Sequence, residues 1–144
     1  MPPAFEIREP TTQAEFDLYR DLRWRILRQP LGRPRTTDSD EPRAIHLAAW
    51  LDGQVIGAGR AYFNSPEEAQ IRGMAVDASR SRNGVGAAIV AELEKRVKER
   101  GAKRIVLNAR HTAVGFYEKC GFRILTELSS EYPSIRYFRM MKDL

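Results

Sequence analysis

A strand-like run, a glycine-containing turn and a helix follow one another directly in the middle of this chain, and this succession constrains the fold most. Residues 71–76 are Ile-Arg-Gly-Met-Ala-Val, and residues 84–100 have the apolar spacing of an amphipathic helix. The free N–H groups and the dipole at a helix N-terminus favour an anion. Gly84 and Gly86 lack the side chains that would keep a phosphate away from the backbone. The segment 79–90 therefore predicts a phosphate-binding site.

Length and composition indicate a single globular domain. The 144 residues are enough to bury a core, and the hydrophobic content of 42% and charged content of 30% are ordinary for such a domain. No apolar run approaches the ~20 residues of a membrane-spanning helix, and the N-terminal residues lack the apolar core of a signal peptide. Cys120 is the only cysteine, which excludes an internal disulfide. We therefore expect one domain over residues 1–144, a cytoplasmic location, no membrane association and no bound metal.

The charge of the chain favours anionic partners. Lys and Arg total 24 against 19 Asp and Glu, which gives a net charge of +5. Arg80 and Arg82 add charge-assisted donors to the predicted phosphate site, and further arginines concentrate within residues 20–35. No helix-turn-helix, zinc-finger or RNA-binding motif is present, so a nucleic acid is not an expected partner. A solvated basic face is the simpler interpretation, and a basic nucleic-acid-binding protein stays open as another class.

Hydrophobic periodicity and turn signals predict a mixed order of strands and helices. The Asp-Gly pair at 52–53 is a strong hairpin signal, and Pro30 would end the first helix. Residues 30–42 are rich in proline and are predicted to form a loop. The predicted strands are 5–8, 45–51, 54–63, 68–76, 105–108, 122–126 and 135–141, and the predicted helices are 13–28, 84–100 and 112–119.

Two motifs in this order resemble the GNAT superfamily of acetyl-CoA-dependent N-acetyltransferases, over about residues 47–122. The loop of that superfamily, Arg/Gln-x-x-Gly-x-Gly/Ala, corresponds to Ser-Arg-Asn-Gly-Val-Gly at residues 81–86. Its later element, Ala followed by Phe/Leu-Tyr-Glu-Lys-x-Gly-Phe, corresponds to residues 113–122. The chain departs from the pattern at Ser81, where Arg or Gln is usual, and at Arg110, where many members carry Asn.

The resemblance implies an α/β (α+β) fold with a mixed, mostly antiparallel sheet flanked by helices. Two splayed parallel central strands would form the slot for acetyl-CoA. The pantetheine arm would pair with the strand at residues 74–76, where the N–H of Val76 or its neighbour would face the thioester oxygen as an oxyanion donor. The cofactor-binding residues that the resemblance implies are Met74, Ala75, Val76, Arg82, Asn83, Gly84, Val85, Gly86, Ala87, Asn108 and Tyr117.

The activity implied is acetyl transfer from acetyl-CoA to a primary amine of a small molecule or peptide, by direct attack. Tyr117 is the candidate general acid, because a phenol held near the sulfur can protonate the departing thiolate. The alternative for Tyr117 is a packed aromatic residue whose hydroxyl bonds a neighbouring carbonyl. Cys120 suggests an acyl-cysteine route, but its surroundings favour a small hydrophobe.

No general base and no acceptor determinant stand out. The candidate bases are His46, His111, Glu67, Glu68 and Asp77, the three carboxylates acting through water. The acidic group at residues 38, 40 and 41 (Asp38, Asp40 and Glu41) would attract a protonated amine if it lies near the slot, or is otherwise a solvated loop.

Two further questions stay open at this point. One is whether the chain is a non-catalytic acyl-CoA-binding or sensing module, which would bind the cofactor in the same way without turnover. Release of thiol from acetyl-CoA in the presence of amines distinguishes an enzyme from such a module. The other is the oligomeric state, since both a monomer and a homodimer are compatible with the sequence.

Overall fold

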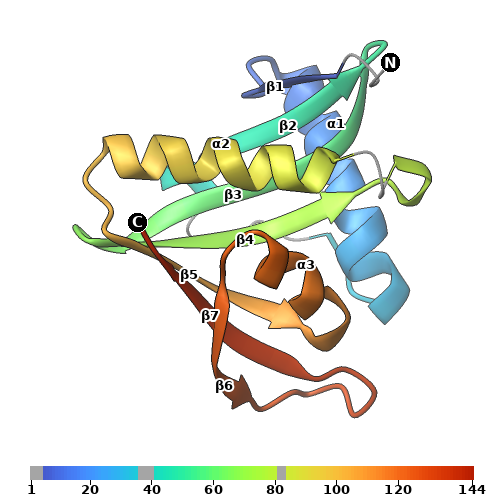
Figure 1. Cartoon of the computed structure of the whole chain (residues 1–144). Coiled ribbons are helices and arrows are strands. Elements are labelled where there is room, and N and C mark those ends of the chain that lie inside the picture. The colour runs from blue at the N-terminus through green and yellow to red at the C-terminus, as the bar shows by residue number, and fades with distance from the viewer. Residues whose placement is uncertain (1–4, 36–40, 81–83) are drawn as a thin grey trace.

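A seven-stranded sheet forms the centre of the molecule (Figure 1). The computed structural model describes residues 5–35, 41–80 and 84–144. The strand order is β1-β2-β3-β4-β5-β7-β6, and β4 with β5 is the one parallel pair among the described strands. This arrangement confirms the mixed, mostly antiparallel sheet. The strands are β1 (Glu6–Arg8), β2 (Ile45–Leu51), β3 (Gln54–Ser65), β4 (Glu68–Val76), β5 (Arg104–Arg110), β6 (Arg123–Leu128) and β7 (Tyr137–Asp143).

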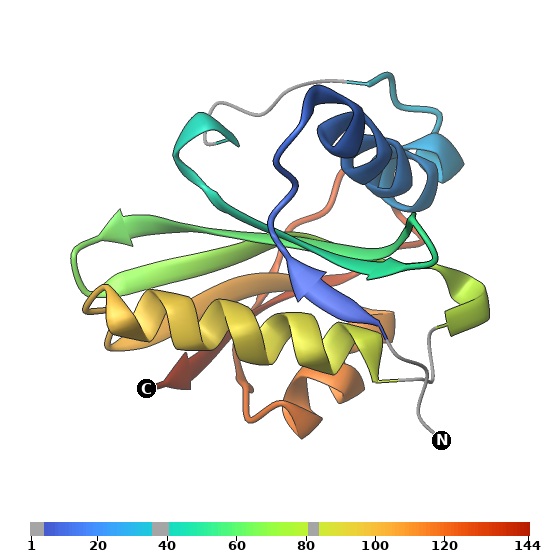
Figure 2. The ribbon, with the colours of Figure 1, turned by 90° about the horizontal axis from the view of Figure 1, so that it is seen from above.

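Helices cover both faces of the sheet. Figure 2 shows α1 (Gln13–Arg23) on one face, and α2 (Val85–Glu99) with α3 (Val114–Lys119) on the other. Sheets with both faces covered bury their central strands, and residues 105–107 of β5 are at most 3% exposed. The prediction of a buried central strand at this position is confirmed.

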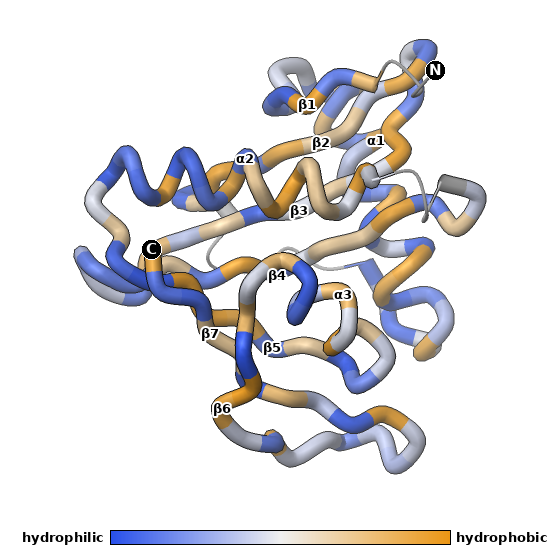
Figure 3. The backbone as a smooth tube through the Cα atoms, in the orientation of Figure 1, coloured by the Kyte–Doolittle hydropathy of each residue, from blue (hydrophilic) through white to orange (hydrophobic). Residues whose placement is uncertain are grey.

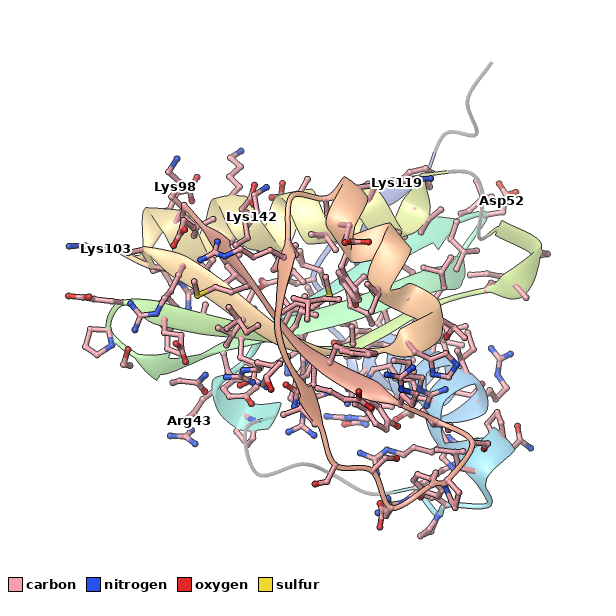
Figure 4. All side chains as sticks on the ribbon, turned by 60° about the horizontal axis from the view of Figure 1, so that its bottom comes forward. Arg43, Asp52, Lys98, Lys103, Lys119 and Lys142 are labelled. Atoms are coloured by element: carbon pink, nitrogen blue, oxygen red, sulfur yellow. The ribbon has the colours of Figure 1, made fainter. Side chains whose placement is uncertain are left out.

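The larger core lies between α2 and the sheet. Hydrophobic and hydrophilic residues alternate along α2 (Figure 3), and the predicted apolar stripe is buried: Val85, Ile89, Val90, Leu93 and Val97. Lys142 of β7 extends towards α2 (Figure 4), where its Nζ lies 2.6 Å from a carboxylate oxygen of Glu94. This ion pair joins the C-terminal strand to the helix whose N-terminus carries the predicted phosphate site.

A smaller core lies under α1. Tyr19 and Leu22 are fully buried against Trp50 and Ala58 of the sheet. α1 begins with a reciprocal cap, because the Thr12 hydroxyl accepts from the N–H of Glu15 at 3.1 Å and the Glu15 carboxylate accepts from the N–H of Thr11 at 2.9 Å. The first helix therefore starts where its sequence predicts.

The predicted helix over residues 13–28 is helical throughout but changes its type along its length, and Pro30 does not end it. The α-helix stops at Arg23, a π-helical turn spans Trp24–Arg28, and a 3-10 turn continues over Gln29–Leu31. Pro30 sits in the first residues of the 3-10 turn, where a missing N–H costs nothing. Gly32, with φ of 68°, ends the helical path instead. The predicted loop at residues 30–42 is accordingly helical at its start, and a second 3-10 turn covers Glu41–Arg43.

Smaller differences concern element ends. β5 extends to Arg110, β7 begins at Tyr137, and the helix predicted from residue 112 begins with a 3-10 turn, His111–Ala113. The hairpin predicted at residues 52–53 is confirmed, since Leu51 pairs with Gln54 across it.

The parallel strands β4 and β5 separate along their length. Their pairing runs from Glu68 with Arg104 to Ile71 with Leu107. β5 then continues to pair with β7 as far as Arg110. Beyond residue 71, β4 pairs with β3 and with no other described strand. The β5-facing backbone edge of β4 is therefore without a neighbouring strand beyond residue 71.

A bulge in β4 accompanies this separation. The register with β3 shifts between Ala58 and Arg60, so that Gly73 and Met74 stand opposite a single residue. Gly73 has a φ of 67°, and a Cβ atom there would lie 2.6 Å from Nη1 of Arg60. Glycine at this position therefore permits both the backbone turn and the close approach of the Arg60 guanidinium.

Candidate functional site

A cavity of about 730 Å³ opens where β4 and β5 separate. Its walls come from the end of the first helix, the middle of β3 and β4, the end of β5, the start of α3 and the loop between β6 and β7. Such a volume is ordinary for a small-molecule site. Of the predicted site residues, the cavity brings together Met74, Asn108 and Tyr117.

Tyr117 is held on α3 between two aromatic rings. Its ring centroid lies 5.0 Å from that of Phe116 and 5.9 Å from that of Phe122, both in edge-on geometry. Tyr117 is only 7% exposed, and burial raises the pKa of its hydroxyl well above the ordinary value. The hydroxyl makes no hydrogen bond with any described residue. Among the described residues, Tyr117 therefore does not form the alternative arrangement, in which its hydroxyl bonds a neighbouring carbonyl.

The predicted pantetheine strand has a free edge. Residues 74–76 pair with β3 on one side, Ala75 with Ala58 and Val76 with Gly57. On the other side no described strand pairs with them. Backbone N–H and C=O groups along this edge are thus available to an extended ligand. Asn108, across the slot on β5, accepts a hydrogen bond through Oδ1 from Nη1 of Arg139 at 2.9 Å.

The N-terminus of α2 is bare. Gly84 occupies the N-cap position with φ of 77°, and among the described residues no side chain caps the helix and no acidic residue lies in its first turn. α1, by contrast, satisfies its first N–H groups with Thr12 and Glu15. The N–H groups of Val85, Gly86 and Ala87 consequently keep their capacity to bind an anion. The prediction for Arg82 and Asn83 falls outside the described residues, as does the side chain of Arg80.

The candidate bases do not line the cavity. His46 is buried under α1, where its Nδ1 lies 3.0 Å from the Tyr19 hydroxyl. His111 ties the start of α3 to β7, because its Nδ1 accepts from the N–H of Arg136 at 3.1 Å. Both histidines therefore have structural partners away from the slot.

The three candidate carboxylates lie elsewhere as well. Glu67 and Glu68 lie where β4 and β5 are still paired, and hydrogen bonds from Asn64 and Arg104 hold the pKa of Glu68 below its usual value. Asp77 accepts from the N–H and hydroxyl of Ser79, at 3.0 and 2.7 Å. Cys120 packs against the main core, and burial raises the pKa of its thiol, which disfavours an acyl-cysteine.

Sequence reasoning missed the arginines that converge on the cavity. They come from the first helix and the segment after it, and from β3, β4 and β5, and only the folded sheet brings them together. The arginines in the lining are Arg23, Arg28, Arg33, Arg60, Arg72 and Arg110. The carboxylate in the described lining is Glu131, whose Oε1 lies 2.8 Å from Nη1 of Arg33. This pair joins the loop between β6 and β7 to the segment after the first helix. Asp38 and Asp40 lie outside the described residues, as does the side chain of Glu41.

Solved structures share this architecture. An aminoglycoside 6'-N-acetyltransferase complexed with coenzyme A is 20% identical and has a TM-score of 0.80, covering 97% of this chain and 96% of that one. Ard1 from Thermoplasma volcanium is 24% identical with a TM-score of 0.79, covering 98% of each chain. The fold is therefore that of the known N-acetyltransferases.

Sequence comparison gives the family. The model of the acetyltransferase (GNAT) family matches residues 5–122. The uncharacterized N-acetyltransferase YjcF of Bacillus subtilis is 33% identical over 106 residues, which cover 74% of this chain and 75% of that relative. The chain belongs to the GNAT family, and it is an acetyl-CoA-dependent N-acetyltransferase.

No helix in residues 5–35, 41–80 or 84–144 is long and apolar enough to span a membrane. Within the same residues, no cluster of three or more His, Cys, Asp or Glu is placed to hold a metal ion.

Proposed function

We propose that the enzyme transfers an acetyl group from acetyl-CoA to the primary amine of a small molecule or peptide, with Tyr117 as general acid. The observation that carries this proposal is the buried Tyr117 hydroxyl, which lines the cavity between the separated strands and has no hydrogen bond to a described residue. A proton donor with these properties is available to a ligand atom in the slot.

The donor would occupy the side of the slot nearest α2. Its pyrophosphate would accept hydrogen bonds from the N–H groups of Val85, Gly86 and Ala87, and Arg82 and Asn83 stay predicted contacts from the sequence. Its pantetheine arm would pair with residues 74–76, and the N–H of Val76 or its neighbour would stabilise the thioester oxyanion. The bare helix N-terminus and the free edge of β4 support this placement.

The reaction would proceed by direct attack. The lone pair of the neutral amine forms a C–N bond with the thioester carbonyl carbon, and the C–S bond breaks with its electron pair on sulfur. Tyr117 gives its proton to that sulfur, while the amine nitrogen loses a proton to water. The tyrosinate regains a proton from water, so that acetyl-CoA and amine become amide and CoA.

Thiol release and product mass test the proposal together. Purified enzyme with acetyl-CoA and a panel of primary amines is expected to release CoA and to form amines heavier by one acetyl group. CoA that binds without thiol release for any amine would instead favour the acyl-CoA-sensing alternative. Thiol release that Tyr117→Phe leaves unchanged would remove Tyr117 from the mechanism.

A further inference from the structure

Two arginines without a carboxylate partner among the described residues, Arg72 and Arg110, line the cavity. Six arginines belong to its described lining; Arg33 pairs with Glu131, and Arg23, Arg28 and Arg60 have interactions of their own, so that Arg72 and Arg110 carry the excess positive charge. In a partly enclosed site such a charge balance raises the local concentration of anions and repels cations. An acceptor bound there would meet the guanidinium groups of both separated strands.

Arg72 lies on the cavity wall without a partner among the described residues. Its side chain lines the cavity from β4, at the point where β4 leaves β5. It makes no hydrogen bond, ion pair or ring contact with any described residue. Its neighbour Ile71 belongs to the core under α2, and successive side chains of a strand point to opposite faces. Arg72 therefore projects on the face of α1, away from the proposed pyrophosphate site.

Arg110 approaches the same cavity from β5. Its Nη2 donates to the backbone carbonyl of Leu27 at 3.1 Å, and this neutral oxygen is its partner within the described residues. Its neighbour Ala109 faces the core under α2, so Arg110 too lies on the face of α1. The carbonyl fixes the position of the guanidinium without neutralising its charge.

The two arginines flank the slot from both separated strands, and each offers a planar fork of donors suited to a carboxylate or a phosphate. We propose that the acceptor is a primary amine that also carries an anionic group, a carboxylate or a phosphate, bound by Arg72 and Arg110. This inference rests on the proposed function, since it names the substrate class of the same site. A cationic amine attracted by acidic residues is the opposite expectation, and a diamine probe tests it.

A matched series of four-carbon amines tests the charge preference. The probes are 4-aminobutanoate, 4-aminobutyl phosphate, 4-amino-1-butanol and 1,4-diaminobutane, each titrated calorimetrically into the enzyme saturated with CoA at low salt. At least one anionic amine is expected to bind roughly tenfold or more tightly than the alcohol and the diamine, and the tighter of the two anionic amines identifies the group. Binding that is equal across the series, absent for both anionic amines, or tightest for the diamine overturns the inference.

Charge variants test the residues. Arg72→Gln and Arg110→Gln are each expected to weaken the binding of the preferred anionic amine roughly tenfold or more, while the affinity for CoA stays unchanged. The matched control is Arg100→Gln, because Arg100 is exposed at the C-terminal end of α2 and its loss changes the net charge equally. An equal effect of all three variants would show a general charge effect and overturn the assignment. Circular dichroism confirms that each variant is folded, and the variant Arg72→Lys, which keeps the charge, should retain part of the affinity.

Turnover separates this inference from the proposed function. The calorimetric experiment needs no chemistry, so anion-selective binding stands or falls by itself. Anion-selective binding without thiol release from acetyl-CoA would leave the binding site in place and contradict the proposed transfer. Thiol release with the alcohol and the diamine alone would support transfer and overturn the anionic acceptor.

Discussion

Tyr117 combines two properties that a general acid needs in this site. Its hydroxyl is protonated at every physiological pH, because burial raises its pKa, and it has no hydrogen bond to a described residue that would hold the proton elsewhere. The neighbouring rings of Phe116 and Phe122 fix the position of the phenol. A positioned donor of this kind typically contributes a factor of 10² or more to a rate.

Replacing Tyr117 by phenylalanine should therefore lower kcat by roughly 10²-fold, with little change in the affinity for acetyl-CoA. The measurement is steady-state thiol release where chemistry limits turnover, together with CoA binding by calorimetry. Tyr62→Phe is the matched control, since Tyr62 lies on β3 outside the cavity lining. An equal loss in the two variants would point to packing rather than proton transfer.

The pH profile provides a second test of Tyr117. In the proposed mechanism the protonated phenol is the active form, so a raised pKa would keep it active to above its ordinary value of about 10. The neutral fraction of the amine meanwhile increases with pH. We expect kcat/KM to rise with pH and reach a plateau near the pKa of the amine, with no descending limb below about pH 10. A descending limb between pH 8 and 10 that disappears in Tyr117→Phe would contradict the raised pKa.

Local sequence predicts one part of the site and not the other. The glycine turn and the motif around Tyr117 are each a contiguous stretch of sequence, so their residue types can be recognised in the chain itself. The arginines of the cavity lie on β3, β4, β5 and the first helix, and no pattern in sequence links Arg72 with Arg110. Their convergence depends on the strand order and on where β4 leaves β5, and both are properties of the folded sheet.

At the scale of elements, the two ends of α2 differ in their proposed roles but share a backbone feature. Gly84 before its first turn and Gly101 after its last have φ of 77° and 99°, and a Cβ atom at either would meet nothing within 4 Å. An L-residue in this left-handed region costs about 1–2 kcal/mol. The two positions therefore form a natural pair for substitution.

Gly84→Val and Gly101→Val should lose similar stability, about 1–2 kcal/mol each in urea unfolding. Gly84→Val alone is expected to weaken CoA binding, by tenfold or more, because its side chain would stand where the pyrophosphate approaches the helix N–H groups. Calorimetric titration with CoA distinguishes the variants. Unchanged CoA affinity in Gly84→Val would place the pyrophosphate elsewhere.

Glu15 links α1 to β1, and this contact is expected to weaken in acid. Its carboxylate accepts hydrogen bonds from Arg8 of β1 and from the N–H of Thr11, which lower its pKa from 4.5 to about 2. Because the folded-state pKa is lowered, the contribution to stability is present above pH 4.5 and is lost as the pH falls towards 2.

Glu15→Gln should therefore lower the urea midpoint of unfolding at pH 7, and the difference from the parent protein should shrink as the pH falls towards 2. Urea unfolding followed by circular dichroism at a series of pH values measures it. Glu99→Gln, on the exposed end of α2 and without an ion pair among the described residues, is the control. A difference that is constant with pH would mean that Glu15 acts by packing and not by its charge.

Element boundaries show the limit of reading local signals alone. Apolar spacing in residues 13–28 predicts one continuous helix, yet the path widens into a π-helical turn after Arg23. One consequence lies in the site, where Arg110 of β5 donates to the carbonyl of Leu27 within that turn. Apolar spacing does not distinguish a π-helical turn from an α-helical one, and π-helical turns are frequent at functional sites.

For the molecule as a whole, the sheet places the two proposed ligands on opposite faces of one slot. The bare N-terminus of α2 lies on the face of the larger core, and the arginines of β4 and β5 lie on the face of α1. The slot between the separated strands joins these faces, with Tyr117 lining it. In the proposed arrangement, the strand separation would let the acceptor amine reach the thioester carbon of acetyl-CoA from the face opposite the pyrophosphate site.

Occupation of the slot should stabilise the entire domain. A ligand that binds the folded state alone adds about 2.7 kcal/mol at a concentration 100 times its Kd. For a chain of this size each kcal/mol raises Tm by roughly 2–4 °C, so CoA at that excess should raise Tm by roughly 5–10 °C. Differential scanning calorimetry with and without CoA measures the shift. Duplex DNA at equal phosphate concentration should give a far smaller Tm shift, which salt abolishes. An equal or larger Tm shift with DNA would instead indicate that the basic residues of the chain bind nucleic acid.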